Sequence, residues 1–325
     1  MIRFANYEDI PKIMQFIDKH WKKGHIMSRN RELFEFQHIW GNEVSFVLSE
    51  NNQEELNGIL GYIPYDLKDR DVMLAIWKTI KTDNTMLGID ILRFLREDST
   101  VKTLSAPGIN PKTRSIYQFL GIPTGKMRHW YRLNQRDKYK IAIIDDFEVP
   151  WACDDKDVSI EEYFEFEKVR TEFEKLDYRR QENRPYKSAD YIKRRYFSHP
   201  VFHYLKYGIR CAGEWLMLIF RVQPYKGSGA LRLIDGIGDL ELFPYFTKTM
   251  DRLMEQLNCE YADIYETGMN ERLLVSGGWK RKETTGNIIP EYFSPFEQRN
   301  VDIYYMSEIP NAVLFKGDGD MDRPN

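Results

Sequence analysis

The chain has 325 residues, 42% of them hydrophobic and 30% charged, so it can bury a core and is long enough for about two domains, which excludes a disordered or fibrous protein. Lys and Arg number 47 against 50 Asp and Glu, and this net charge of -3 gives no general attraction to nucleic acid. The apolar runs are far shorter than the roughly 20 residues of a membrane helix, and residues 1–4 show no signal-peptide pattern, so we expect a cytoplasmic protein without a membrane span.

The first 135 residues alternate between strand and helix patterns. A strand is expected at 2–5, and Asp9 can cap a helix in which Ile10, Ile13 and Ile17 recur at helical spacing. Further helices are expected at 31–40, 88–97 and 110–121, and further strands at 44–49, 58–65, 72–80, 102–107 and 126–133. The three strands between 44 and 80 follow one another directly, which predicts an antiparallel meander.

The second half repeats this order of elements. Residues 136–157 lose the periodicity and turn acidic, so we expect a linker there between domains at 1–135 and 158–325. Beyond it, helices are expected at 159–176, 189–197, 242–257 and 271–276, and strands at 201–208, 214–223, 229–237 and 260–266. The shared order predicts an α/β (α+β) protein with two tandem copies of one fold, each a mixed, mostly antiparallel sheet flanked by helices.

The segment after the strand at 102–107 carries a spaced motif. It places Asn110, Tyr117 and Gly121 at fixed offsets, with Ile122 following. This pattern resembles the GNAT superfamily of N-acetyltransferases, in which the Asn contacts coenzyme A and the Tyr protonates the departing thiolate. The resemblance implies that Asn110 binds the coenzyme and that Tyr117 is the general acid. Read without the resemblance, Asn110 caps a helix and Tyr117 is a core aromatic residue.

A second segment falls where these enzymes hold the coenzyme pyrophosphate on a loop before a helix. Gly88 matches that loop, whereas Thr85 stands where Arg or Gln is usual and Asp90 where a small residue is usual. The resemblance implies a pyrophosphate site on the backbone N–H groups of Thr85, Met86, Leu87, Gly88, Ile89 and Asp90. It also implies that Lys78, Thr79 and Ile80 pair with the pantetheine amides, leaving backbone N–H groups to stabilise an oxyanion.

The second copy lacks a matching proton donor. Leu274 stands four residues before Gly278, where the first copy has Tyr117 before Gly121. We therefore expect that only the first copy binds acyl-coenzyme A, and that the second forms a wall of the acceptor site.

The acceptor site is predicted from basic and aromatic residues. Residues 179–195 interleave basic side chains with tyrosines, and Arg184, Tyr186 and Lys187 can contact phosphates and stack on a base, unless they only form a solvated helix face. In the first copy, Lys23 and Arg29 flank His25, a candidate general base. Asp235 and Glu266, at the ends of two strands, compete with His25 as the base, as does a relay through water, and Glu266 is also a candidate contact for the acceptor.

No metal or disulfide chemistry is expected. The cysteines at 153, 211 and 259 are odd in number and have no zinc-ligand spacing, which predicts reduced, buried thiols. The Asp-rich residues 317–325 lack the later Glu of a calcium loop, so we expect an acidic segment without metal.

The tandem arrangement is similar to bacterial N-acyltransferases that act on nucleotide-linked amino sugars. We therefore expect direct transfer of an acetyl or hydroxyacyl group from acyl-coenzyme A to the amine of a nucleotide-linked deoxyamino sugar, for O-antigen or capsule synthesis. One alternative is an aminoacyl-tRNA-dependent transferase acting on a cell-wall peptide precursor. The other is a non-catalytic module that binds nucleotide sugars. The sequence leaves the oligomeric state open.

Overall fold

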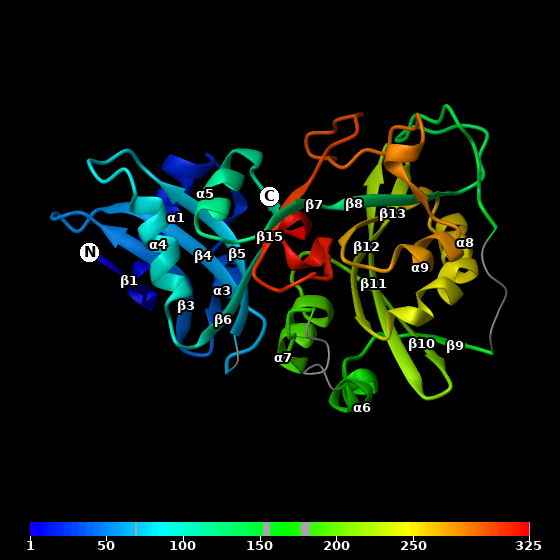
Figure 1. The fold of residues 1–325 in the computed structure, drawn as a ribbon, viewed down its shortest axis with the longest axis horizontal. Coiled ribbons are helices and arrows are strands. Elements are labelled where there is room, and N and C mark those ends of the chain that lie inside the picture. Colours follow the sequence, from blue (N-terminus) through cyan, green and yellow to red (C-terminus); the bar gives the residue numbers. More distant parts are fainter. Residues whose placement is uncertain (69, 152–156, 177–182, 325) are drawn as a thin grey trace.

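The computed structural model describes residues 1–324 except 69, 152–156 and 177–182. Two mixed β-sheets lie side by side, each covered by helices (Figure 1). The predicted α+β architecture with two similar copies is thereby confirmed.

The first sheet has the strand order β1-β3-β4-β5-β6-β15-β7, with β2 beside β3. Its strands are β1 (Ile2–Ala5), β2 (Ile39–Trp40), β3 (Glu43–Glu50), β4 (Leu56–Pro64), β5 (Arg70–Thr79), β6 (Val101–Ile109), β7 (Thr124–Lys126) and β15 (Tyr304–Ser307). Helices α1 (Ile10–Phe16), α2 (Ile26–Arg29) and α3 (Arg31–His38) precede the meander, and α4 (Leu87–Arg96) and α5 (Arg114–Phe119) flank β6 along the chain. Ile59 packs among residues of α1 and α3, whereas Leu60 packs among residues of α4, because successive side chains of a strand face opposite sides.

The second sheet has the order β14-β8-β13-β12-β11-β10-β9, with β16 beside β13. Its strands are β8 (Arg128–Leu133), β9 (Ser159–Glu162), β10 (Leu205–Cys211), β11 (Glu214–Tyr225), β12 (Ser228–Gly238), β13 (Cys259–Thr267), β14 (Lys280–Arg281) and β16 (Leu314–Phe315). The helices of this half are α6 (Glu167–Lys175), α7 (Ala189–Ile192), α8 (Thr247–Gln256) and α9 (Glu271–Ser276). Short 3-10 or π turns lie at Tyr7–Asp9, Ile17–Trp21, Pro111–Thr113, Lys193–Phe197, Leu240–Phe246, Lys282–Thr284, Lys316–Asp318 and Asp320–Asp322.

The two sheets exchange one strand each. Strand β15, near the end of the chain, lies between β6 and β7 of the first sheet, and β8 lies at the equivalent place between β13 and β14 of the second. The expected division at residues 136–157 therefore does not coincide with the division between the sheets, since β8 precedes that linker and already belongs to the second sheet. Figure 1 shows β7 and β8 in line, crossing from one sheet to the other.

Two predicted elements of the second half differ from the structure. Residues Ser159–Glu162 form β9 and not the start of a helix, because Ile160 and Glu162 turn inward in alternation and pair with β10 at the sheet edge. Residues 201–204 precede β10 and are not part of it.

Two further observations concern the cysteines and the apolar character of the described helices. Cys259 is buried and Cys211 is half-buried, both as free thiols, and Cys153 lies outside the described residues. Within the described ranges, no helix combines the length and the apolar character that crossing a bilayer requires.

Candidate functional site

The first sheet opens between β5 and β6. These neighbours run parallel and pair only from Arg70 with Val101 to Met73 with Ser105. Beyond that point β5 pairs with β4 and β6 with β15, so among the described residues no strand pairs with the facing edge of β5 after Met73. We call this opening the first split; its exposed backbone edge can accept an extended ligand with amide groups.

A β-bulge lies in β5 beside the first split. Leu60 pairs with Trp77 and Tyr62 with Leu74, so Ala75 and Ile76 together oppose a single residue of β4. A bulge turns backbone N–H groups away from the regular ladder and commonly occurs next to active sites.

The strand geometry separates the predicted pantetheine contacts into those that face β4 and those that face the first split. The Ile80 N–H donates to the Asn57 carbonyl at 2.9 Å, so it is directed at β4 and is not available at the first split. Because backbone groups alternate between the two edges of an antiparallel strand, the Thr79 and Trp77 amides face the split, whereas Lys78 shares the orientation of Ile80. The edge groups are therefore those of Trp77 and Thr79.

The N-terminus of α4 lies after an exposed loop. Thr85 and Met86 are exposed, and Leu87 begins the helix and is buried. The Met86 N–H donates to Asn84 Oδ1, and Asn84 Nδ2 donates to Asp90 Oδ2, both at 2.9 Å. Asn84 thus holds the Asp90 carboxylate at the first turn of α4, where it opposes the binding of an anion. Sequence reasoning missed Asn84, although Asn before a helix is a typical signal of such a turn.

Tyr117 lies close to the first split. It is 3% exposed, and its ring packs against Trp77 of β5 with 5.7 Å between the ring centroids. Trp77 also contacts Gly88, where an added Cβ would lie 3.5 Å from the indole. Among the described residues the Tyr117 hydroxyl makes no hydrogen bond, and burial raises the pKa of this phenol well above its ordinary value of 10.0. The phenol therefore keeps its proton at neutral pH.

Asn110 caps the turn that leads into α5. Its Oδ1 accepts the Lys112 N–H at 3.0 Å, and Gly121 ends the helix at a φ of +72°, a conformation that favours glycine. Asn110 is exposed at the start of this turn.

His25 lies in a cleft next to the bulge. This cleft is lined by His25, Ala75 and Asp320, among others. His25 Nδ1 accepts the Met27 N–H at 3.3 Å at the start of α2, so in the neutral ring the proton is on Nε2. To act as a base, His25 would have to give up this bond. Lys23 is exposed on the loop before α2, and Arg29 is exposed at the end of α2.

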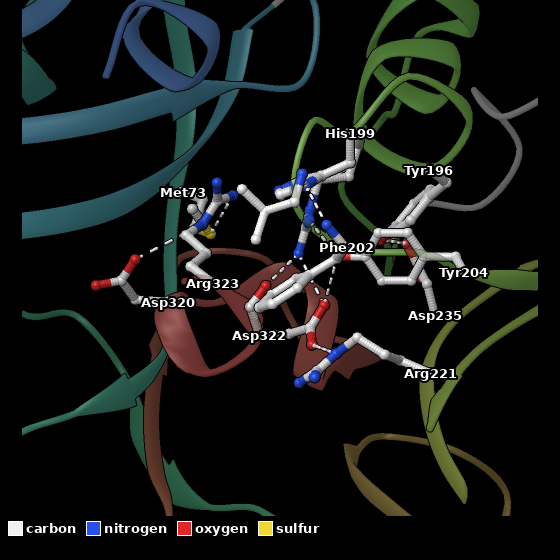
Figure 2. Close-up of polar contacts among 12 residues, drawn as sticks. Met73, Tyr196, His199, Phe202, Tyr204, Arg221, Asp235, Asp320, Asp322 and Arg323 are labelled. Atoms are coloured by element: carbon white, nitrogen blue, oxygen red, sulfur yellow. Dashed lines mark hydrogen bonds and ion pairs between the residues drawn. The ribbon is translucent and has the colours of Figure 1, made fainter. Parts of the chain in front are cut away.

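Three other predicted site residues are engaged in buried bonds. Asp235 has no exposed surface and accepts from Lys187 Nζ at 2.6 Å and from the Tyr196 hydroxyl at 2.7 Å, the latter bond shown in Figure 2. Glu266 is also fully buried and accepts from Arg128 and from Trp130. Both carboxyl groups and the Lys187 ammonium are therefore engaged with protein partners in this structure.

The described part of the basic segment, 183–195, bonds to other parts of the protein, although Lys193 within it is exposed. Tyr186 N–H donates to Asp71 Oδ2 of β5 at 2.8 Å, and Arg184 Nη1 donates to the Gly238 carbonyl at 3.0 Å. Arg195 is buried and pairs with Asp322. Residues 179–182 lie outside the described residues. The Tyr186 bond therefore links this segment to the first half, whereas the Arg184 and Arg195 bonds stay within the second half.

The second sheet has an equivalent opening, but the chain itself fills it. β12 and β13 run parallel from Gly229 with Cys259 to Leu233 with Ile264. Beyond this, Glu266 pairs with β8 on one edge and with Phe315 of β16 on the other, so β16 occupies the opening. An added Cβ at Gly236 of β12 would lie 3.3 Å from the Phe315 ring. In this second split, β16 therefore pairs with the strand edge that stays unpaired in the first split.

Comparisons with solved structures identify the architecture. A GCN5-related N-acetyltransferase from Anabaena variabilis matches with a TM-score of 0.57 and 12% identity, over 95% of this chain and 72% of that one. A conserved protein of unknown function from Enterococcus faecalis matches with a TM-score of 0.57 and 10% identity over the same shares, 95% and 72%. The chain has a tandem GNAT fold. A candidate acetyltransferase from Pyrococcus horikoshii gives a TM-score of 0.50 at 12% identity, over 99% of this chain and 95% of that one. No protein-family model and no curated protein matches the sequence, and these identities support the tandem GNAT fold alone.

Proposed function

We propose that the protein is an N-acyltransferase that uses acyl-coenzyme A and acylates a primary amine. The observation that carries this proposal is the first split, an unpaired strand edge with a bulge, next to the N-terminus of α4. An extended chain with two amides and a pyrophosphate fits these features, because the strand edge offers backbone partners and the helix terminus offers free N–H groups.

Different residues at the first split would bind different parts of acyl-coenzyme A. The Trp77 and Thr79 backbone groups pair with the pantetheine amides, and the N-terminus of α4 from Gly88 faces the pyrophosphate. Asn110 lies exposed at the cap of α5, where it can contact the same ligand. Asp90 reduces the affinity for the anion and does not abolish the site.

Acyl-coenzyme A supplies an activated thioester carbonyl. When the amine nitrogen attacks that carbon and the C–S bond breaks, Tyr117 gives its proton to the sulfur, and the proton of the amine passes to solvent or a base.

The acceptor we propose is a nucleotide-linked deoxyamino sugar. Its support is the resemblance to enzymes of surface-polysaccharide synthesis and the exposed Lys23 and Arg29 near the cleft of His25, which can meet a diphosphate. Lys187 does not add to this support, because its ammonium pairs with Asp235 and Asp318. An aminoacyl-tRNA-dependent transferase has no use for the first split.

Calorimetric titration with acetyl-coenzyme A tests the proposal first. We expect binding, and its absence would overturn the function and favour the tRNA-dependent alternative. Thiol release with UDP- and dTDP-linked amino sugars then tests the acceptor, and binding without release would favour a non-catalytic module.

The Tyr117→Phe variant tests the acid. We expect kcat to fall by about 10²–10⁴ with coenzyme affinity unchanged, since only the proton donor is removed. Tyr292→Phe, an exposed tyrosine of the second half, is the matched control. Equal turnover in the two variants would remove Tyr117 from the mechanism.

A further inference from the structure

Helix α1 and the π turn that follows it have one apolar and one basic side. Ile13 and Ile17 are fully buried in a cluster with residues of β3 and β4. Lys12, Lys19 and Lys22 are exposed on the outer side. They recur at intervals of seven and three residues, and such intervals keep side chains on the same side of a helix. The three lysines therefore project together into solvent.

Strand β5 adds a fourth cation to this side. Lys78 is half-buried and lies near His20 of the π turn, because burial, then Lys19 and then Lys78 lower the pKa of the His20 ring. His20 is therefore neutral at neutral pH and does not repel the lysines. Trp21 lies next to Lys22 and is 44% exposed. We call Lys12, Lys19, Trp21, Lys22 and Lys78 the basic ridge.

The charge of the basic ridge is not compensated by nearby carboxylates. Within the described ranges, none of its four lysines forms an ion pair. Asp18 is the only acidic residue between 10 and 30, and it accepts from the Gly24 N–H at 2.7 Å and from the Ser28 hydroxyl at 3.0 Å. The whole chain has a net charge of -3, so the ridge stands out from a protein that is otherwise more negative.

The chemistry of the ridge suits an extended anionic surface. Its cations are lysines, which carry a point charge and lack the planar fork with which arginine recognises one phosphate group. Exposed tryptophan is enriched at the boundary between lipid headgroups and acyl chains, and clustered lysines bind anionic lipids. Single-stranded nucleic acid is typically bound in a positively charged groove, whereas these side chains project outward from a helix.

We infer that the basic ridge docks the protein on an anionic lipid bilayer, with the lysines facing the headgroups and the Trp21 indole entering between them. Lys78 lies between Trp77 and Thr79 of β5, whose backbone amides face the first split. Docking thus brings the open end of the first split toward the bilayer. The inference does not depend on the proposed function, because lipid binding is measured without coenzyme or acceptor.

Cosedimentation of the full chain with vesicles tests the inference. One set of vesicles contains phosphatidylcholine alone, and the other contains one part phosphatidylglycerol to two parts phosphatidylcholine. We expect the anionic vesicles to bind at least tenfold more tightly, and this preference should shrink as salt is added, since salt screens the lysine charges. Equal binding to the two sets of vesicles, or no binding to either, would overturn the inference.

A triple variant tests whether the ridge is the surface that binds. A lysine near an anionic bilayer strengthens binding about fivefold, so Lys12→Gln, Lys19→Gln and Lys22→Gln together should weaken it about 100-fold. The matched control makes the same change in net charge at exposed lysines of the second half, and it should bind as the wild type does. Its substitutions are Lys138→Gln, Lys168→Gln and Lys226→Gln. Equal binding of the two folded triple variants would overturn the inference.

Two further measurements identify the contact. Tryptophan emission should shift to the blue when anionic vesicles are added, and Trp21→Phe should remove that shift; a shift that persists would place the contact elsewhere and overturn the inference. A single-stranded oligonucleotide, titrated at the same salt concentration, should bind more weakly than the anionic vesicles. Tighter binding of the oligonucleotide would make the ridge a nucleic-acid surface and overturn the lipid assignment.

Discussion

Asp90 places a negative charge where the proposed ligand carries its pyrophosphate. The residue lies in the first turn of α4, and Asn84 Nδ2 holds its carboxylate at 2.9 Å. A carboxylate there stabilises the helix by its interaction with the free N–H groups, and for the same reason it competes with an anionic ligand. Asp90 therefore stabilises the helix and lowers the affinity of its N-terminus for an anionic ligand.

Replacing Asp90 with Asn should strengthen coenzyme binding. One charge at a helix terminus is worth about 0.3–1 kcal/mol, which corresponds to a gain in affinity of roughly twofold to fivefold. Calorimetry at low salt measures it, and the gain should shrink as salt is added. Glu255→Gln, which removes a charge far along the chain on α8, should change nothing. Weaker binding to the Asp90→Asn protein would contradict a pyrophosphate at this helix.

The structure places some of the predicted site residues beside the first split and pairs others with distant partners, for one physical reason. Tyr117 and the α4 loop are local features, since their places follow from helix spacing and from the preceding strand. Asp235 and Lys187 carry the right chemistry for a site, but they bond to each other across 48 residues of sequence. No local pattern reveals such a partner, so a buried ion pair looked like two free groups.

Among the elements, those with their own periodicity were predictable and those completed by a distant partner were not. The helices α4 and α9 follow the 3.6-residue pattern closely. The strands β15 and β16 span four and two residues, and their pairing partners belong to β6, β7 and β13. A strand of that length has no pattern of its own, so the exchange of strands between sheets escaped sequence analysis.

Gly319, within residues 316–324 (the clamp segment), lies against Pro107 of β6. A Cβ at this position would lie 2.3 Å from the Pro107 carbonyl oxygen, a distance that real Cβ atoms do not adopt. The contact is with backbone, which cannot rotate away as a side chain can. Any larger residue must therefore move the segment that carries Asp320.

The Gly319→Ala variant should lose about 1–3 kcal/mol of unfolding free energy, as overpacked substitutions do. Urea denaturation followed by fluorescence measures the loss. Gly286→Ala is the matched control, because an added Cβ there would lie 3.5 Å or more from its neighbours. Equal stability of the two variants would mean that the clamp segment adapts at no cost.

At the scale of the whole molecule, the two halves form one connected structure. Each sheet contains a strand from the other half, and the aromatic cluster around Tyr191 of α7 includes Trp40, Tyr65 and Met73 of the first half. The clamp segment passes between the sheets, in red in Figure 1. β16 thus closes the second split, and the clamp segment that follows it brings Asp320 to the cleft beside the first.

This asymmetry predicts one coenzyme per chain. The backbone edge of Glu266 and Thr267 that an extended ligand would need is already paired with β16, whereas the edge of β5 after Met73 is open. Displacing β16 would break these bonds and expose Phe315, which is 1% accessible, so ligand binding at the second split would have to offset that loss. Calorimetric titration should therefore give a stoichiometry of one. The affinity of that single site should respond to Asp90→Asn, because only the first split adjoins α4. A stoichiometry of two, or a single site that the substitution does not affect, would place the coenzyme elsewhere.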